Sequence, residues 1–294
     1  MHHLTTIERR ALKRISTPHG GVMIVAADQR NSMKAVMGSP DVTREQLRDA
    51  KGDLARLLAA HGPAILLDAE VALPWVIDED VLPRDTALVV GMDASGYEMV
   101  EGLRHTRYVP AVTPGRVRRL GGDAAKMLFY LRPDLQDLDS RVAGEIRGLV
   151  ELCDAEGLLL IVEILTYHLD SESPEEYEAV FPSLISRSAE FAVACGARML
   201  KLPYPGSAAA CAEVTSAAAG VPWAVLSAGV DHGTFVGQVD TAVRHGAAGA
   251  MAGRSLWKDS LSVDPDVRAE LLTTRAVPRL AELQSTIDGA LAAR

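Results

Sequence analysis

Short and almost unbroken apolar runs recur along the whole chain, and segments with helical periodicity separate most of them. Because the runs lack the alternation of a strand with one face in water, they are typical of parallel strands covered on both faces. The eight predicted strands are residues 22–28, 64–68, 87–93, 125–131, 158–165, 198–203, 223–229 and 248–254.

Start and stop signals mark the helices between these strands. Thr43 and Gln46 have the spacing of a capping box. Ser173 is followed by Pro174, a residue favoured at the first helical position. The predicted helices are residues 43–60, 139–156, 173–196 and 233–245, a short helix from Thr113, and two C-terminal helices broken near Pro278. The connections after the second and third strands are predicted to be irregular.

Eight strands alternating with helices, without a linker or low-complexity stretch, predict a single (β/α)8 TIM barrel that occupies residues 1–294 as one domain. A doubly wound open sheet is the alternative. One apolar face of the last helix is expected to close the barrel, and a homo-oligomer built on that face is the other interpretation. The face consists of Leu280, Leu283, Ile287 and Leu291.

Charge and cysteine content limit the class of protein. The net charge is −9, whereas nucleic-acid binding depends on clustered lysines and arginines, so no nucleic-acid partner is expected. No window approaches the roughly 18 apolar residues of a membrane span, and the first residues lack a signal-peptide pattern. Cys153, Cys195 and Cys211 have neither metal-binding nor disulfide spacing, which indicates buried thiols in a cytoplasmic protein.

Two lysines lie inside apolar strands, Lys126 in the fourth and Lys201 in the sixth. Lysine is seldom buried unless it is paired, so both positions need an explanation. The structural interpretation is that each lysine either extends its ammonium group to water or forms a buried ion pair with Glu163 of the fifth strand or Asp28 of the first. The catalytic interpretation is that one lysine amine attacks a ketone and forms a Schiff base.

Schiff-base chemistry requires an uncharged amine. At an ordinary lysine pKa of about 10.4, fewer than about one lysine in a thousand is neutral at pH 7. Burial and a nearby second ammonium both lower a lysine pKa, and the pair Lys126 and Lys201 supplies both effects in a barrel mouth. Glu163 would then be the acid and base that expels water from the carbinolamine.

A phosphate site is predicted after the seventh and eighth strands, where barrels often bind phosphate. Small residues there let backbone N–H groups approach an anion, and an arginine adds a charge-assisted contact. The residues are Ser227, Ala228, Gly229, Gly253 and Arg254. The alternative is that the two glycines serve only as turn residues.

The histidines give no support for a metal site. From His19 onward they form no His-x-His or His-x3-His pair, so neither a metal nor another cofactor is expected. His168 and His232 lie just beyond strand ends, and a solvated-loop position is favoured over substrate contact for both.

Seven segments in order carry a resemblance to a known family. They are ADQR at 27–30, AILLDAE at 64–70, GGDAAKMLFY at 121–130, VEILTY at 162–167, LKLP at 200–203, PWAVLSAGV at 222–230 and AGRSLW at 252–257. Over nearly its full length the chain resembles the class I, Schiff-base aldolases of the tagatose 1,6-bisphosphate and sulfofructose 1-phosphate type.

The resemblance implies a function for each matching position. Lys201 matches the Schiff-base lysine, Lys126 the second lysine of the site and Glu163 the acid/base glutamate. Asp28 and Gln29 match residues that contact the sugar hydroxyls, and either Asp28 or Glu163 would accept the C4 hydroxyl proton during cleavage. The positions that match the C1 phosphate site are Ser227, Gly229, Gly253 and Arg254. Arg30, with Lys34, either binds a second anion at the far end of the substrate or faces solvent.

These observations predict a metal-independent aldolase whose partner is a small phosphorylated ketose. It would cleave a ketohexose 1-phosphate of the tagatose 1,6-bisphosphate type into dihydroxyacetone phosphate and a three-carbon aldehyde. An aldolase for 6-deoxy-6-sulfofructose 1-phosphate, which releases sulfolactaldehyde, is the alternative within the family. Two alternatives of other classes are an enolising isomerase or epimerase with Glu163 as base, and a phosphosugar-binding barrel without catalysis.

Overall fold

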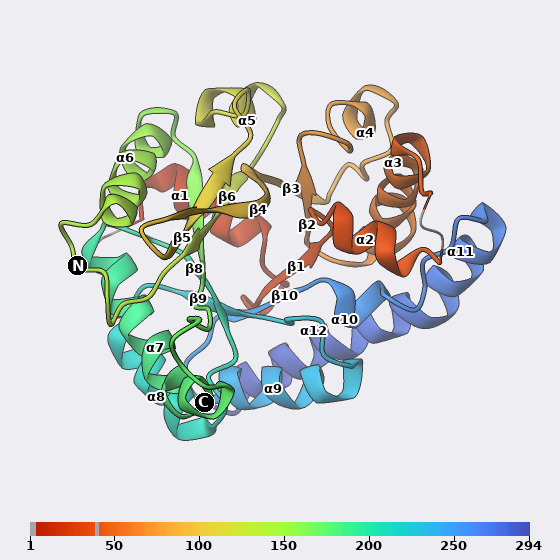
Figure 1. Ribbon diagram of the computed structural model, residues 1–294. Coiled ribbons are helices and arrows are strands. Elements are labelled where there is room, and N and C mark those ends of the chain that lie inside the picture. The colour runs from red at the N-terminus through yellow and green to blue at the C-terminus, as the bar shows by residue number, and fades with distance from the viewer. Residues whose placement is uncertain (1–3, 39–40) are drawn as a thin grey trace.

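The computed structural model describes residues 4–38 and 41–294, which contain a closed barrel of eight parallel strands (Figure 1). Around the barrel the strand order is β1-β10-β9-β8-β7-β6-β3-β2. Helices surround it, so the predicted (β/α)8 barrel is confirmed and the open sheet is wrong. The barrel strands are β1 Val22–Ala26, β2 Ala64–Asp68, β3 Ala87–Gly91, β6 Ala124–Tyr130, β7 Leu159–Leu165, β8 Leu200–Pro203, β9 Trp223–Leu226 and β10 Gly249–Ala252.

Several strands end earlier than predicted. β1 stops at Ala26, β9 at Leu226 and β10 at Ala252. Asp28 and Ser227 therefore lie in loops after their strands, and Arg254 is the first residue of α10. All three are at the C-terminal mouth of the barrel, where TIM-barrel enzymes carry their catalytic residues.

The helices follow the predicted start signals closely. Thr43 and Ser173 both accept a hydrogen bond from the backbone N–H three residues on, in complete capping boxes. The helices are α1 Thr6–Arg14, α2 Asn31–Val36, α3 Arg44–Asp53, α4 Trp75–Asp78, α5 Pro114–Arg119, α6 Arg141–Ala155, α7 Pro174–Ala194, α8 Ala208–Ala217, α9 His232–Arg244, α10 Arg254–Trp257, α11 Pro265–Leu271 and α12 Val277–Ala292.

Two helix predictions need correction. The predicted helix 43–60 ends as an α-helix at Asp53 and continues as a wider π-type segment, Leu54–Leu58, and a short 3-10 turn, Ala59–His61. The predicted break near Pro278 is instead a π-type segment that ends just before α12, so the chain stays helical into the first turn of α12, which contains Pro278. The division between α11 and α12 is the π-type segment Leu272–Ala276.

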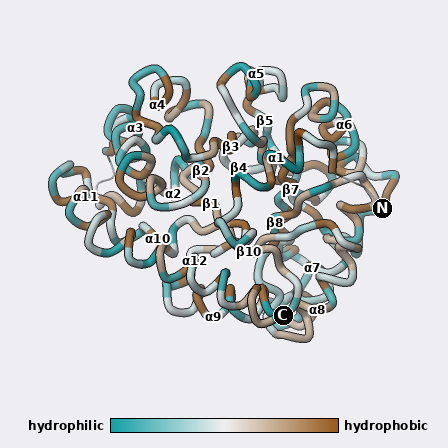
Figure 2. The backbone as a smooth tube through the Cα atoms, turned by 180° about the vertical axis from the view of Figure 1, so that it is seen from behind, coloured by the Kyte–Doolittle hydropathy of each residue, from teal (hydrophilic) through white to brown (hydrophobic). Residues whose placement is uncertain are grey.

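The hydrophobic core has two layers. Outward-facing strand residues pack against the surrounding helices, whereas inward-facing residues, both small such as Ala26 and Ala64 and large such as Ile161, fill the barrel. Ala11 and Ile15, from α1 and its end, close the barrel from its N-terminal side. Figure 2 shows hydrophobic and hydrophilic stretches alternating along the surrounding helices, as expected when one face packs on a barrel.

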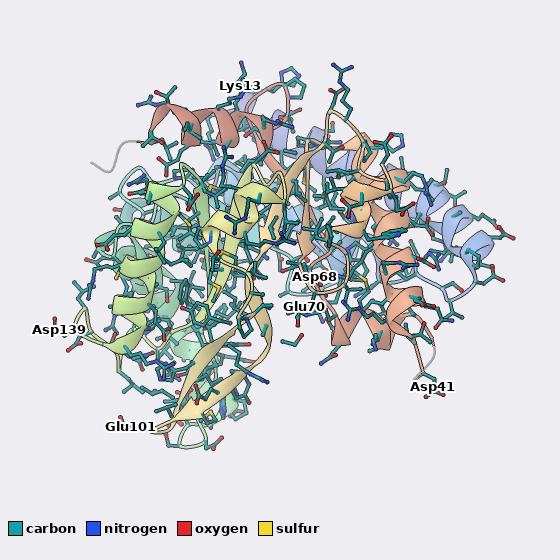
Figure 3. The ribbon with its side chains drawn as sticks, turned by 90° about the horizontal axis from the view of Figure 1, so that it is seen from above. Lys13, Asp41, Asp68, Glu70, Glu101 and Asp139 are labelled. Carbon is teal, nitrogen blue, oxygen red and sulfur yellow. The ribbon has the colours of Figure 1, made fainter. Side chains whose placement is uncertain are left out.

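A two-stranded antiparallel hairpin, which the sequence did not predict, occupies the connection between β3 and β6. Its strands are β4 Asp93–Val100 and β5 Leu103–Tyr108, and both contact β6. Glu101 and Gly102 form the turn, both with positive φ (52° and 80°). Figure 3 shows Glu101 at the tip of the hairpin, at the edge of the molecule, with Asp68 and Glu70 nearer the centre.

The last helix, the cysteines and the absence of a membrane-spanning segment were also predicted from the sequence. Leu280, Leu283 and Ile287 are fully buried within the chain, so this face of α12 closes the barrel as expected. The three cysteines are free and buried. Within the described residues, none of the helices has both the length and the apolar character that crossing a membrane requires.

Candidate active site

The alternation of strand residues aims four charged side chains into the barrel mouth. Ala26, Ala124, Ile161 and Met199 belong to the cluster that fills the barrel interior. Two residues further on, on the same side of each chain, lie Asp28, Lys126, Glu163 and Lys201. All four line a cavity of about 360 Å³ at the C-terminal end of the barrel. The structure thus brings together the four residues that the sequence predicted to be catalytic.

Both lysines form ion pairs in this cavity. Lys126 Nζ lies 2.7 Å from Glu163 Oε2 and 3.0 Å from Asp28 Oδ2. Lys201 Nζ lies 3.0 Å from Glu163 Oε1, so the two oxygens of one carboxylate contact two ammonium groups. The lysine side chains are 3% and 6% exposed, which excludes the alternative that either extends into water. The buried ion pairs of the structural interpretation are therefore present.

A third carboxylate, Asp93, completes the cluster. Its Oδ1 accepts hydrogen bonds from Lys126 Nζ at 2.9 Å and from the backbone N–H of Leu128 at 3.3 Å. Asp93 is the last residue of a predicted strand, but the sequence pattern alone indicates no function for it. The available signal was its position, because a carboxylate that follows a buried barrel strand lies at the same mouth as the other strand ends.

The charges of the cluster stabilise one another. Burial opposes ionisation of Lys126, but Asp28, Asp93 and Glu163 outweigh it and raise its pKa well above the ordinary value. Burial likewise opposes ionisation of Glu163, yet Lys126 and Lys201 hold its pKa below the usual range. The pKa of Asp28 is lowered by the same lysines against the effect of burial. Lys126 is therefore a fixed cation that three carboxylates surround.

Unpaired acceptor atoms face the same cavity. Asp28 and Gln29 line it, and Oδ1 of Asp28 and Oε1 of Gln29 are buried without a hydrogen-bond partner among the described residues. A buried acceptor left unpaired costs free energy, so such atoms are suited to hydroxyl groups of a ligand. The Gln29 amide nitrogen would lie 3.1 Å from a Cβ added at Gly253, which leaves no room there for a larger residue.

The guanidinium of Arg30 is occupied by the protein itself. Its Nε and Nη2 donate to Ser95 Oγ at 3.1 Å and to the Asp93 carbonyl at 2.8 Å. Its Nη1 lies 2.6 Å from Glu70 Oε2. The side chain is 12% exposed, so it does not face solvent freely, and its contacts join the first loop to the base of the hairpin.

The five residues of the predicted phosphate site lie together after β9 and β10. The backbone N–H of Gly253 points at Ser227 Oγ, 3.4 Å away, which links the two loops. Ala228 and Gly229 both have positive φ (48° and 86°), and a Cβ at Gly229 would approach the Arg254 guanidinium to 3.1 Å. Gly229 therefore allows the arginine to lie flat against the loop, with its charge at the mouth of the barrel.

Two further lysines, which the sequence did not indicate, donate hydrogen bonds to backbone carbonyls of the loops at the barrel mouth. Lys51 of α3 is fully buried and donates to the carbonyl oxygens of Ala27 and Gln29 at 2.5 and 2.7 Å, on both sides of Asp28. Its Nζ also pairs with Asp68 at 2.6 Å, and burial outweighs that partner and lowers the Lys51 pKa. Lys258 donates to the Gly229 carbonyl at 2.8 Å.

Comparison with known proteins gives one family. Residues 22–259 match the family described as DeoC/LacD family aldolase. Tagatose 1,6-diphosphate aldolase 2 of Streptococcus pyogenes serotype M1 is 26% identical, with 97% of this chain and 96% of the relative covered. Tagatose 1,6-diphosphate aldolase of Lactococcus lactis subsp. lactis is 25% identical over 90% of this chain and 88% of its own.

Solved structures give the same fold. A Schiff base-forming fructose-1,6-bisphosphate aldolase superposes with a TM-score of 0.66 at 16% identity, over 95% of this chain and 98% of the other. Fructose-bisphosphate aldolase from Slackia heliotrinireducens also has a TM-score of 0.66, at 17% identity, over 97% and 92% of the two chains. At these identities the likeness establishes the barrel architecture alone.

Proposed function

Because the chain belongs to the DeoC/LacD family of aldolases, and is thus a carbon–carbon lyase, we propose that it cleaves a ketohexose 1-phosphate through a Schiff base on Lys201. The substrate would be of the tagatose 1,6-bisphosphate type, and the products dihydroxyacetone phosphate and a three-carbon aldehyde. The observation that carries this proposal is the 3.0 Å contact between Lys201 Nζ and Glu163 Oε1 inside a buried cavity.

Glu163 is the base that deprotonates the Lys201 ammonium, which cannot attack a ketone while it is charged. It takes a proton from the Lys201 ammonium, which frees a lone pair to attack C2 of the ketose. This transfer removes one of the two cations that lower the Glu163 pKa, so the affinity of the carboxylate for the proton rises. After the carbinolamine nitrogen passes a proton to the C2 oxygen, Glu163 returns its own proton and the hydroxyl leaves as water. The iminium remains, and Glu163 is a carboxylate again.

The iminium then serves as the electron sink for cleavage. Glu163 accepts the C4 hydroxyl proton, the C3–C4 bond breaks, and its electron pair moves through C2 to neutralise the iminium as an enamine. The C4 fragment departs as the aldehyde. Protonation of C3 by Glu163 restores the iminium and leaves Glu163 a carboxylate. Addition of water at C2 then releases dihydroxyacetone phosphate, and Lys201 returns to its ammonium form.

The neighbouring residues bind and orient the substrate. Lys126 keeps its charge throughout and fixes the carboxylates of Asp28, Asp93 and Glu163 around the reacting carbons. Asp28 and Gln29 offer their unpaired oxygens to sugar hydroxyls. The C1 phosphate would bind the loops after β9 and β10, through Ser227, Ala228, Gly229, Gly253 and Arg254.

Borohydride trapping tests the proposal. Addition of borohydride during turnover of tagatose 1,6-bisphosphate should reduce the iminium to a stable secondary amine, and peptide mass spectrometry should place the adduct on Lys201. K201M should give no adduct and no cleavage. K13M, a matched change on α1 at the opposite end of the barrel (Figure 3), should leave both unchanged. An adduct on another lysine, or cleavage without an adduct, would contradict the assignment.

A further inference from the structure

The turn after β9, residues 227–230, leaves two of its backbone N–H groups free. The Val230 N–H donates to the Ser227 carbonyl at 3.1 Å, and the two residues between them, Ala228 and Gly229, both have positive φ. Within residues 4–38 and 41–294, the N–H groups of Ala228 and Gly229 donate to no other group. A turn with free N–H groups is suited to an anion, provided that its carbonyl oxygens point elsewhere.

Two cations of α10 hold those carbonyl oxygens. Arg254 Nη2 lies 3.4 Å from the Ala228 carbonyl oxygen. Lys258 Nζ lies 2.8 Å from the carbonyl oxygen of Gly229 and 3.4 Å from that of Val230. Because Arg254 and Lys258 are four residues apart in one helical turn, their side chains lie on the same face and reach the same loop.

The helix that carries these cations is fixed to the barrel. Leu256 and Trp257 are fully buried, and Trp257 Nε1 donates to the Ala26 carbonyl at the end of β1, 3.0 Å away. The Lys258 backbone N–H donates to the Arg254 carbonyl at 3.0 Å, so the lysine continues the helical turn. The ammonium group of Lys258 therefore extends from a backbone that is held in place.

Lys258 fixes the direction of a carbonyl that the residue type leaves undecided. Glycine adopts positive and negative φ about equally readily, so Gly229 alone does not orient the peptide groups on either side of it. A carbonyl oxygen carries partial negative charge, and one that turned toward a bound phosphate would repel it. The contact with the Lys258 ammonium favours the arrangement in which the Gly229 carbonyl points at α10.

We propose that Lys258 is the positioning residue of the turn 227–230, and that it keeps the carbonyls of Gly229 and Val230 on α10 so that the free N–H groups stay available to the C1 phosphate. The lysine acts through the backbone and does not contact the substrate. This assignment rests on the proposed function, which puts the C1 phosphate on this turn. It deepens that function by identifying a residue that makes the site selective for a phosphorylated ketone.

The test compares two ketones that differ only in a phosphate group. Dihydroxyacetone and dihydroxyacetone phosphate each condense with the Lys201 amine and lose water, and hydride from borohydride reduces the iminium to a secondary amine that mass spectrometry quantifies. The measured value is the ketone concentration that gives half-maximal trapping. In K258M it should rise about 10-fold with dihydroxyacetone phosphate, as expected when a charge-assisted contact is lost, and should not change with dihydroxyacetone.

Two further variants separate charge from fold. K258R keeps the positive charge, so its value with dihydroxyacetone phosphate should lie between those of the wild type and K258M. K13M removes a lysine from the opposite end of the barrel and should change neither value. If K258M does not fold, K258Q, which keeps a donor but not the charge, takes its place with the same expectation.

Each outcome decides the proposal. A rise of the same size with both ketones would show that Lys258 only supports the fold, and no rise with dihydroxyacetone phosphate would remove its positioning function. K258R that behaves as K258M does would also contradict the proposal. Wild type that traps dihydroxyacetone on Lys201 without preferring the phosphorylated ketone overturns this inference and leaves the Schiff base intact. Wild type that traps neither ketone overturns the proposed function as well.

Discussion

At the scale of single residues, Lys126 differs most from its expected function. The sequence predicted a second ammonium that would lower the pKa of the first by repulsion. In the structure three carboxylates surround Lys126, and its pKa is raised even though burial acts in the opposite direction. The cluster holds three carboxylates and two lysines, so its net charge is not positive. Lys126 is better described as the counter-ion that organises the site.

Replacement of Lys126 should therefore affect stability as well as activity. K126M leaves buried carboxylates without their shared counter-ion, and we expect the free energy of unfolding at pH 7 to fall by about 3–5 kcal/mol. Chemical denaturation followed by circular dichroism measures this. The exposed lysine variant K13M should lose less than about 0.5 kcal/mol.

The stability difference should depend on pH with a definite sign. In the wild type the lowered pKa values of Asp28 and Glu163 stabilise the fold above about pH 4, and this contribution is lost as the pH falls further. In K126M the lysine charge no longer offsets the effect of burial on Asp28 and Glu163, so the pKa values of both carboxyls rise. Acidification then protonates these carboxyls and removes the unfavourable buried negative charge of the variant. The difference between wild type and K126M should thus shrink from about pH 7 to about pH 5, and a constant difference would contradict the account.

The sequence predicted the residues that strand alternation aims into the barrel. A lysine or glutamate inside an apolar strand stands out, as Lys126, Glu163 and Lys201 do. Lys51 does not stand out, because lysines are common in helices. Only its place on the apolar face of Leu47, Leu54 and Leu58 indicated burial. The sequence offered Glu163 and Asp28 as partners of the lysines, but it could not tell which carboxylate pairs with which lysine, since the distances between strand ends depend on barrel closure.

At the scale of elements, α3 positions the first loop of the site. Lys51 donates to backbone carbonyls on both sides of Asp28 and pairs with Asp68 of β2, so one helix fixes two strand ends. K51M should lower the free energy of unfolding by about 3–5 kcal/mol and lower kcat/KM, because Asp68 stays buried and Arg30, at 4.0 Å, is then its nearest cationic partner among the described residues. The double variant K51M/D68N should recover part of the stability, as thermal denaturation would reveal. A double variant less stable than K51M would show that the pair is not the cause.

The hairpin of β4 and β5 is the element that the sequence did not predict. Residues 93–108 contain few apolar positions, and much of β4 is exposed, so the run lacks the pattern of a half-buried strand. The turn signal was present but weak. Glu101-Gly102 stands between Val100 and Leu103, and both turn residues have positive φ, which asparagine or aspartate adopts more readily than glutamate in such turns.

At the scale of the whole molecule, the two ends of the barrel serve different purposes. The order of eight apolar runs was enough to predict the closed barrel, because parallel strands joined by helices have few ways to bury both faces. Ala11 and Ile15 close the N-terminal end, whereas the charged cluster occupies the C-terminal end. The net charge of −9 is compatible with the anionic substrate proposed above, since a cation such as Arg254 at the start of α10 acts locally.

Transfer of solvent oxygen is the most direct test of the central claim. If Lys201 forms an iminium, the C2 oxygen of the ketose leaves as water and the product takes its oxygen from solvent. Cleavage in ¹⁸O-labelled water, with immediate reduction of dihydroxyacetone phosphate to block background exchange, should give one labelled oxygen per turnover. K201M should neither cleave the substrate nor speed the exchange. Products that retain the original C2 oxygen would contradict the Schiff base.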